Sequence, residues 1–283
     1  DSDWSSDVCS SDLLLTAQDG LGEVRRIGIG ESKMAWEATW SPDGEHVAFV
    51  DDDARVRVID VERGRVETVD VGGTNLEIGR MGLTWSPDSQ WLAYAKTFDN
   101  MFRRIVVWSA DDDATFVLTD ALADAMAPAF DRDGRHLYFL ASTDLALGSG
   151  WANTSAITAD PTYAAWVMIL RDDDPTPFPL RSDEEDVKED DGESEDEEKG
   201  EEKGEEKDED GDAEEDEGVR IDVDGIERRI VALPMPAARY RMTVAGPEGT
   251  VFIGESVEGA PGMNLQKFSL EDREAELFVE GVS

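Results

Sequence analysis

The chain has 283 residues, of which 40% are hydrophobic and 8% aromatic, which is enough to bury a core. Its formal net charge of −41 argues against nucleic acid and against an anionic membrane surface as partners. No apolar run approaches the roughly 20 residues that a helix needs to span a bilayer, so no membrane partner is expected.

Residues 1–13 resemble the conceptual translation of a short sequencing adaptor, so we expect them to be foreign to the protein. They lack the basic region and the continuous apolar stretch of a signal peptide. The alternative is a genuine N-terminal tail. Setting them aside removes Cys9, the single cysteine of the chain. A chain without cysteine has no disulfide framework, which fits a reducing, cytoplasmic location.

A five-residue motif organises the rest of the chain. Trp40-Ser41-Pro42-Asp43-Gly44 recurs as Trp85-Ser86-Pro87-Asp88-Ser89 and, weakened, as Phe130-Asp131-Arg132-Asp133-Gly134, so the copies are 45 residues apart. Ser, Pro and Gly at these positions suit a type I turn, and a short apolar run follows each copy. Each copy therefore predicts a hairpin of two strands.

A period of about 45 residues with several short, alternating strands is typical of propeller blades. We predict an all-β partial β-propeller of about four four-stranded blades with WD40-like (PD40) repeats, over residues 14–182 and 219–283. The blades are expected at 34–71, 79–118, 126–233 with an interruption, and 239–279. A surplus strand at 22–29 precedes them, so we interpret the chain as an open arc that is truncated at both ends.

The third blade is expected to be interrupted twice. Residues 142–162 are rich in Gly, Ser, Thr and Ala and predict a long loop before a strand at 163–170. Residues 183–218 hold 24 acidic residues and 4 lysines, a net charge of −20, which leaves −21 for the rest of the chain. Such a segment has too little apolar surface to offset its ordering entropy, so we predict a disordered acidic linker. A solvating role is favoured over binding of cations or a basic partner.

No catalytic, cofactor or metal site is predicted. The two histidines, His46 and His136, are two repeat periods apart and each follows its turn glycine by two residues, so both are repeat positions at a strand start. The segment Gly254–Gly259 misses the G-x-S-x-G elbow by one residue. A serine nucleophile would also need an activating base within reach.

The remaining candidates have simpler structural interpretations. The runs Asp51–Asp53, Asp111–Asp113 and Asp172–Asp174 lack the spacing that wraps one calcium ion, and we predict solvated turns. Gly72–Asn75 is too short for a phosphate loop and has no helix-like pattern after it. Five tryptophans recur within the blades and are predicted to pack between them: Trp36, Trp40, Trp85, Trp91 and Trp108.

Two segments resemble a known family. Residues 166–178, which end in Asp172-Asp173-Asp174-Pro175-Thr176-Pro177-Phe178, are followed by Ser182-Asp183-Glu184-Glu185. They resemble the part of bacterial tricorn proteases where a propeller strand runs into a Ser-Pro-Phe motif and a variable acidic linker. Residues 221–236 resemble the strand after that linker. The resemblance covers nearly the whole chain after Leu13, and Thr176 stands where the family tends to have serine.

The resemblance implies a fragment of the seven-bladed propeller of a large cytoplasmic serine peptidase. That enzyme has two propellers, a PDZ-like domain and a catalytic core, is commonly a hexamer, and trims oligopeptides. The fragment would gate or channel peptide substrates and contact other domains of the same chain. The family's catalytic Ser, His and Glu lie in later domains, and no position here matches them. From the charge of −21 outside the linker we expect a preference for basic or neutral peptides.

Two alternatives stay open because the turn motif also occurs in other propellers. A TolB-like scaffold would bind protein partners, would have no catalytic domain and would normally carry an export signal. The gating propeller of a prolyl oligopeptidase-like enzyme would be followed by an α/β-hydrolase with a G-x-S-x-G elbow. Sequence on either side of the chain would separate these three functions.

Overall fold

The computed structural model describes residues 12–17, 19, 23–144, 161–179, 218–259 and 262–282. These residues form strands β1 to β18 and two short 3₁₀ helices, which confirms the predicted all-β class. Within the described ranges, the helices are too short to cross a bilayer.

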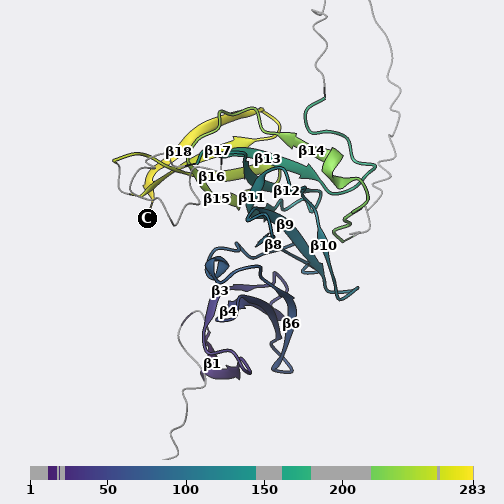
Figure 1. Cartoon of the computed structure of the whole chain (residues 1–283), viewed down its shortest axis with the longest axis vertical. Coiled ribbons are helices and arrows are strands. Elements are labelled where there is room, and N and C mark those ends of the chain that lie inside the picture. Colours follow the sequence, from purple (N-terminus) through teal and green to yellow (C-terminus); the bar gives the residue numbers. More distant parts are fainter. Residues whose placement is uncertain are drawn as a thin grey trace, which may run out of the picture.

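Four antiparallel sheets of four strands follow one another along the chain, from the purple sheet at the bottom of Figure 1 to the yellow one at the top. Strands are paired in chain order within each sheet, so each sheet is one blade. Blade one contains β3 (Ala35–Trp40), β4 (His46–Asp51), β5 (Arg55–Asp60) and β6 (Arg65–Val71). Blade two contains β7 (Thr84–Trp85), β8 (Trp91–Thr97), β9 (Arg103–Ser109) and β10 (Ala114–Val117).

The two C-terminal blades have the same order. Blade three contains β11 (Asp124–Phe130), β12 (His136–Ser142), β13 (Ala164–Ile169) and β14 (Ile230–Ala232). Blade four contains β15 (Tyr240–Ala245), β16 (Thr250–Ser256), β17 (Met263–Ser269) and β18 (Glu274–Val282). The predicted partial propeller of four blades is therefore confirmed.

Two strands are short. β7 has only two residues, and just before it the backbone N–H groups of Met81 and Gly82 donate to the Glu37 carboxylate of blade one, while the Met81 carbonyl accepts the backbone N–H of Ala95 in β8. Before β14, which has three residues, the chain forms the 3₁₀ helix η3 (Ile226–Arg229). The side chain of Arg229 holds this turn in place by donating to the carbonyls of Ile169 and Leu170.

A two-stranded sheet precedes blade one. β1 (Asp12–Leu15) pairs with β2 (Arg25–Gly28), so the surplus strand that we expected at 22–29 has a partner. Ile27 and Ile29 are buried against blade one. Asp12 and Leu13, which we had assigned to the foreign segment, are the first residues of β1, whereas residues 1–11, with Cys9, lie outside the described residues.

The hydrophobic core lies between adjacent blades. One cluster joins blades one and two, where Val50 and Val58 meet Leu92 and Tyr94. Corresponding clusters join blades two and three and blades three and four. Each blade thus buries its faces against its neighbours, and a single blade has no core of its own.

The inner segments of the first three blades each have a residue with positive φ at the same repeat position. Glu37, Gly82 and Ala127 are 45 residues apart and have φ values of 55°, 66° and 53°. The pairing register shifts beside Glu37 and beside Ala127, as at a β-bulge. The bulges also connect blades, because Glu37 accepts two backbone N–H groups of the next blade and the Ala127 carbonyl accepts the Thr243 hydroxyl.

The two interruptions of blade three lie largely outside the described residues, which omit 145–160 and 180–217. The residues that flank the acidic linker are in place. The Phe178 ring packs edge-on against Phe268 of blade four, with centroids 6.4 Å apart. On the other side, the backbone N–H of Val219 donates to Asp88 of blade two over 2.6 Å.

Replacing Glu37 with alanine is expected to destabilise the chain by about 1–3 kcal/mol, because the N–H of the buried Met81 and the N–H of Gly82 lose their acceptor. Urea unfolding followed by tryptophan fluorescence measures the change. Glu45→Ala is the matched control, since Glu45 is exposed. Equal urea midpoints for the two variants would show that the carboxylate does not join the blades.

Candidate functional site

A cavity of about 1140 Å³ lies on the concave side of the arc, where the innermost strands of the blades converge. Its walls are residues of β7, β11 and β15 together with Glu37 and Pro42 of blade one. The three equivalent residues with positive φ, Glu37, Gly82 and Ala127, all line it. The repeat therefore places equivalent positions of successive blades around one axial wall.

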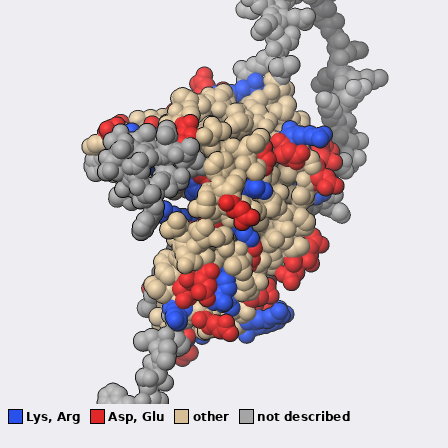
Figure 2. Space-filling model, viewed as in Figure 1, with Lys and Arg blue, Asp and Glu red and all other residues tan. Residues whose placement is uncertain are grey.

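The axial wall combines large apolar side chains with several arginines. Its large apolar members are Leu83, Trp85, Met126, Pro128, Phe130, Met242 and Val244. Its charged members are Arg80, Arg103, Arg132, Arg241 and Glu37. In Figure 2 several blue basic side chains are visible beside the hollow on the left, while red and blue groups are mixed over the rest of this face.

The wall carries uncompensated positive charge. Both oxygens of Glu37 accept backbone N–H groups. Arg80 and Arg132 are exposed and form no ion pair with another residue that the structure describes. The wall therefore has a local charge opposite in sign to the −41 of the chain.

Arg103 is held rigidly at one end of the wall. Its guanidinium forms a two-pronged pair with the buried carboxylate of Asp124, and Tyr163 donates its hydroxyl to the same carboxylate over 3.1 Å. Burial lowers the pKa of Arg103, but the bonds to Asp124 outweigh this effect and the pKa is raised. Arg103 thus stays charged, with that charge already balanced by Asp124.

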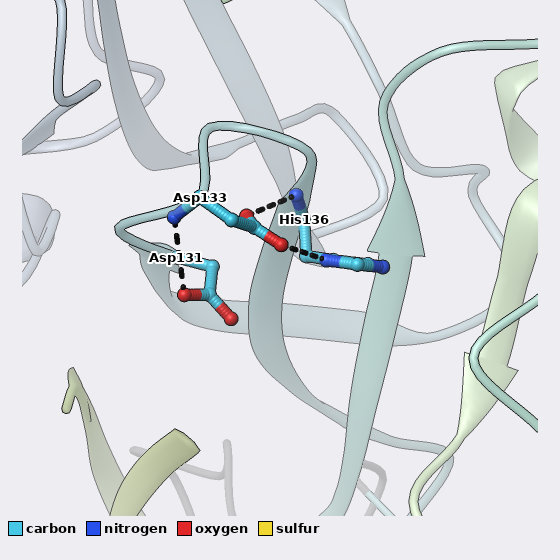
Figure 3. Close-up of side chains that lie close together, drawn as sticks. All are labelled: Asp131, Asp133 and His136. Carbon is cyan, nitrogen blue, oxygen red and sulfur yellow. Dashed lines mark hydrogen bonds and ion pairs between the residues drawn. The ribbon is translucent and has the colours of Figure 1, made fainter. Parts of the chain in front are cut away.

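A second polar cluster surrounds the turn between β11 and β12 (Figure 3). The imidazole Nδ1 of His136 lies 2.6 Å from Asp133, and the Asp133 backbone N–H points to Asp131. Asp131 is completely buried, accepts the Tyr138 hydroxyl over 2.5 Å and accepts the backbone N–H of Gly249 over 3.0 Å. Burial raises the pKa of both Asp131 and Tyr138.

The turn cluster has the residue types of a metal site, since ligand atoms of Asp131, Asp133 and His136 lie within 4.8 Å of one another. The carboxylate oxygens, however, are already used by Tyr138, Gly249 and His136. A similar group, Asp172, Asp173 and Asp222, surrounds the guanidinium of Arg220. Both clusters are therefore bonding networks of the protein itself, and neither is assigned as a metal centre.

The two histidines occupy the places expected from the repeat. His46 is the first residue of β4 and His136 the first of β12. The His46 ring lies 6.2 Å from the Trp85 ring, as part of the packing of the first two blades. Ser256, the serine nearest to an elbow motif, is the last residue of β16 in an all-strand blade.

Two of the aspartate runs are less exposed than we expected. Asp51 is completely buried and accepts bonds from Ser32 and Arg55, because it closes β4 rather than forming a turn. The carboxylate of Asp174 is mostly buried against Arg135. The prediction of solvated turns is therefore wrong for these two residues.

Two other sequence candidates differ in detail from the prediction. Gly72–Asn75 leads into a one-turn 3₁₀ helix, η1 (Asn75–Glu77), capped by Thr74. Among the tryptophans, Trp85 and Trp108 are buried between blades one and two, as predicted. Trp40 is 49% exposed, because it lies on a face of blade one that no described strand covers at that position.

Fold and site together define a propeller module whose inner strands line a cavity with apolar and basic side chains. The family model described as the tricorn protease second beta propeller domain matches residues 9–283. The chain therefore belongs to this family of propeller domains.

Curated relatives agree with the family. Tricorn protease homolog 1 of Streptomyces coelicolor is 27% identical over 274 residues, which are 92% of this chain and 23% of the relative. The tricorn protease of Thermoplasma volcanium is 30% identical over 132 residues, 44% of this chain and 12% of the relative. The chain thus spans about a quarter or less of these two proteins.

Solved structures show the same fold. The crystal structure of the tricorn protease superposes with a TM-score of 0.60 at 17% identity, over 90% of this chain and 23% of that one. A putative TolB from Agrobacterium tumefaciens gives a TM-score of 0.55 at 13% identity, over 95% of this chain and 73% of that one. At these identities the likeness concerns the propeller fold alone.

The turn cluster predicts a pH-dependent contribution to stability. Burial raises the pKa of Asp133, but bonds from His136 and from two backbone N–H groups outweigh this and lower it below the ordinary 3.8. Stability from this lowered pKa is present above pH 3.8 and is lost as the pH falls through the folded-state value. Asp133→Asn should therefore cost about 1–3 kcal/mol at pH 7 and much less at pH 3.

Urea unfolding of wild type and Asp133→Asn at the two pH values tests this dependence. Asp111→Asn is the control, since Asp111 is an exposed residue of a hairpin turn. A stability difference that is the same at pH 3 and pH 7 would contradict the role assigned to the Asp133 carboxylate.

Proposed function

We propose that this chain is the non-catalytic propeller module of a tricorn-like serine peptidase, and that it gates or channels oligopeptides to a catalytic core outside the chain. The observation that supports this function is the axial wall, which four successive blades build from their innermost strands. Cytoplasmic location, contact with other domains and assembly into a hexamer belong to the same proposal. These three features are supported by membership of the tricorn family.

The chemistry of the wall suits an extended peptide. Apolar side chains such as Leu83, Met126 and Val244 accept varied side chains without requiring one sequence. A cavity of about 1140 Å³ is of the order that holds a short peptide segment, and it is far too small for a folded domain. Selection by this module would therefore be steric.

The charge of the wall reverses the preference that we expected from the whole chain. Arg80 and Arg132 line the cavity without carboxylate partners among the described residues, so acidic peptides and free carboxylates should be attracted. The net charge of −21 outside the linker is spread over the molecule and does not describe this surface. The proposed module favours acidic over basic peptides.

A TolB-like scaffold is the second candidate, and the structural likeness to a putative TolB supports its fold. The family match over residues 9–283 favours the tricorn module. A scaffold would be indifferent to changes on the axial wall, so the two functions differ in a measurable way.

Val244→Trp, placed in a full-length peptidase that carries this propeller, should lower the turnover of long oligopeptides several-fold. Val244 lines the cavity and is 45% exposed, so the larger ring fills the passage without entering the core. Hydrolysis of fluorogenic peptides of increasing length measures the effect, and the shortest substrates should be affected least. Val117→Trp is the control, since Val117 is 42% exposed on the outer strand β10.

If both variants degrade long peptides at the wild-type rate, the gating function is wrong. If both lose activity equally on all substrates, the effect is one of folding. The effect of Val244→Trp must increase with the length of the peptide substrate, because the proposed mechanism is obstruction of a passage.

The charge preference is tested with matched acidic and basic fluorogenic peptides at 20 mM and 500 mM salt, values of the order that change screening strongly. We expect the acidic peptide to be cleaved faster at low salt and the difference to shrink at high salt. Arg132→Gln should reduce the preference, while Arg63→Gln, on an exposed turn of blade one, should leave it unchanged. Faster cleavage of the basic peptide would refute the proposed role of the wall.

A further inference from the structure

A smaller pocket of about 350 Å³, which we call the mouth pocket, adjoins the axial cavity where one blade connects to the next. It shares Arg80, Arg103, Tyr163 and Arg241 with the axial wall. Two large apolar side chains, Leu76 and Met101, complete its outer lining and are 63% and 55% exposed. Exposed apolar side chains beside a cation are a combination that a folded chain does not need for its own stability.

We propose that this mouth pocket binds the C-terminal residue of an oligopeptide, taking the free carboxylate at Arg80 and a large apolar side chain between Leu76 and Met101. The inference rests on the proposed peptide-channelling function and adds to it a specific end of the substrate and a residue class.

The charges around the mouth pocket leave Arg80 as a binding group. The carboxylate of Glu77 is buried and accepts the backbone N–H groups of Thr74 and Thr97. The carboxylate of Asp124 is saturated by Arg103 and Tyr163. Both acids of the pocket already accept hydrogen bonds from the protein, whereas Arg80 is exposed and forms no ion pair with another residue that the structure describes. An incoming carboxylate can therefore form a charge-assisted bond with the Arg80 guanidinium.

The apolar side of the mouth pocket is held in place before any ligand binds. Leu76 lies in the capped helix η1, where its backbone N–H donates to the Thr74 hydroxyl. Glu77 fixes this helix to β8 through Thr97. The Leu76 side chain is therefore presented by a rigid loop, which lowers the ordering cost of binding.

Met101 is held in an unfavourable conformation. Its φ of 65° lies in the left-handed region, which a long side chain rarely adopts. The hairpin turn that contains it is fixed by a bond from the Met101 N–H to the Phe98 carbonyl and by a bond from Asn100 to the Ala121 carbonyl. The hairpin turn therefore presents the Met101 side chain at the edge of the mouth pocket.

The test uses the chain itself and three peptides with an N-terminal fluorophore, followed by fluorescence anisotropy. The first is Gly-Ala-Gly-Ala-Leu with a free carboxylate, the second is its C-terminal amide, and the third ends in serine. We expect the first to bind about tenfold more tightly than either of the others, as one charge-assisted contact or one buried apolar side chain contributes on this scale.

Three exposed-site variants assign the two halves of the mouth pocket. Arg80→Gln should abolish the difference between acid and amide, and Leu76→Ser should abolish the difference between the leucine and serine peptides. Leu122→Ser is the control, because Leu122 is 78% exposed on a nearby connection but does not line the pocket. Unchanged urea midpoints confirm that all three variants are folded.

Equal affinity for the acid and the amide would overturn the proposal that the mouth pocket binds a peptide C-terminus. So would Arg80→Gln and Leu76→Ser variants that bind the peptides as Leu122→Ser does. If the affinity does not depend on the C-terminus of the peptide but is lowered by Val244→Trp, the mouth pocket is rejected and the channelling function is retained. Failure of every peptide to bind would also reject the pocket, while the length-dependent assay on the full-length peptidase would still decide the channelling function independently.

Discussion

Hydrogen bonds between one blade and the backbone of the next determine how this arc is assembled. At the axis, the Glu37 carboxylate of blade one accepts the backbone N–H groups of Met81 and Gly82, which lead into blade two. Hydrophobic burial between blades supplies most of the favourable free energy, but it is not directional. The polar contacts define the register in which one blade meets another, because a buried N–H group without an acceptor costs roughly 1–3 kcal/mol. The shape of the axial wall depends on that register.

The turn at the opposite end of each innermost strand serves the same purpose. In blades one and two, Ser41 and Ser86 donate to the aspartate two residues later, over 2.5 Å in both cases. Blade three has Asp131 in place of this serine, and a carboxylate cannot donate. It accepts bonds from Tyr138 and from Gly249 of blade four instead. The copy of the motif that matches the others least is thus the one that joins two blades through a buried charge.

The fold could be predicted from the sequence because it depends on local, repeated signals. The turn residues and the alternation of apolar side chains identify β4, β8 and β12 and their partners. The bond between Glu37 and the Met81 N–H could not be predicted, since it joins residues 44 positions apart and local patterns do not reveal it. The strand β1 was missed because its first two residues fell in a segment that we had interpreted as foreign.

The functional surface was the least predictable part, and the reason is geometric. Arg80, Arg103, Arg132 and Arg241 follow no motif and come from three blades and the connections between them, so only the closed packing of the blades brings them to one wall. Net charge concealed them, since a chain with 67 acidic residues and 26 basic ones reads as uniformly acidic. The equivalent positions 37, 82 and 127 were a usable signal, because a repeat of 45 residues places equivalent positions at the same distance from the axis. Charge in a propeller therefore has to be counted by repeat position, since the inner strands line the axial cavity and the outer strands do not.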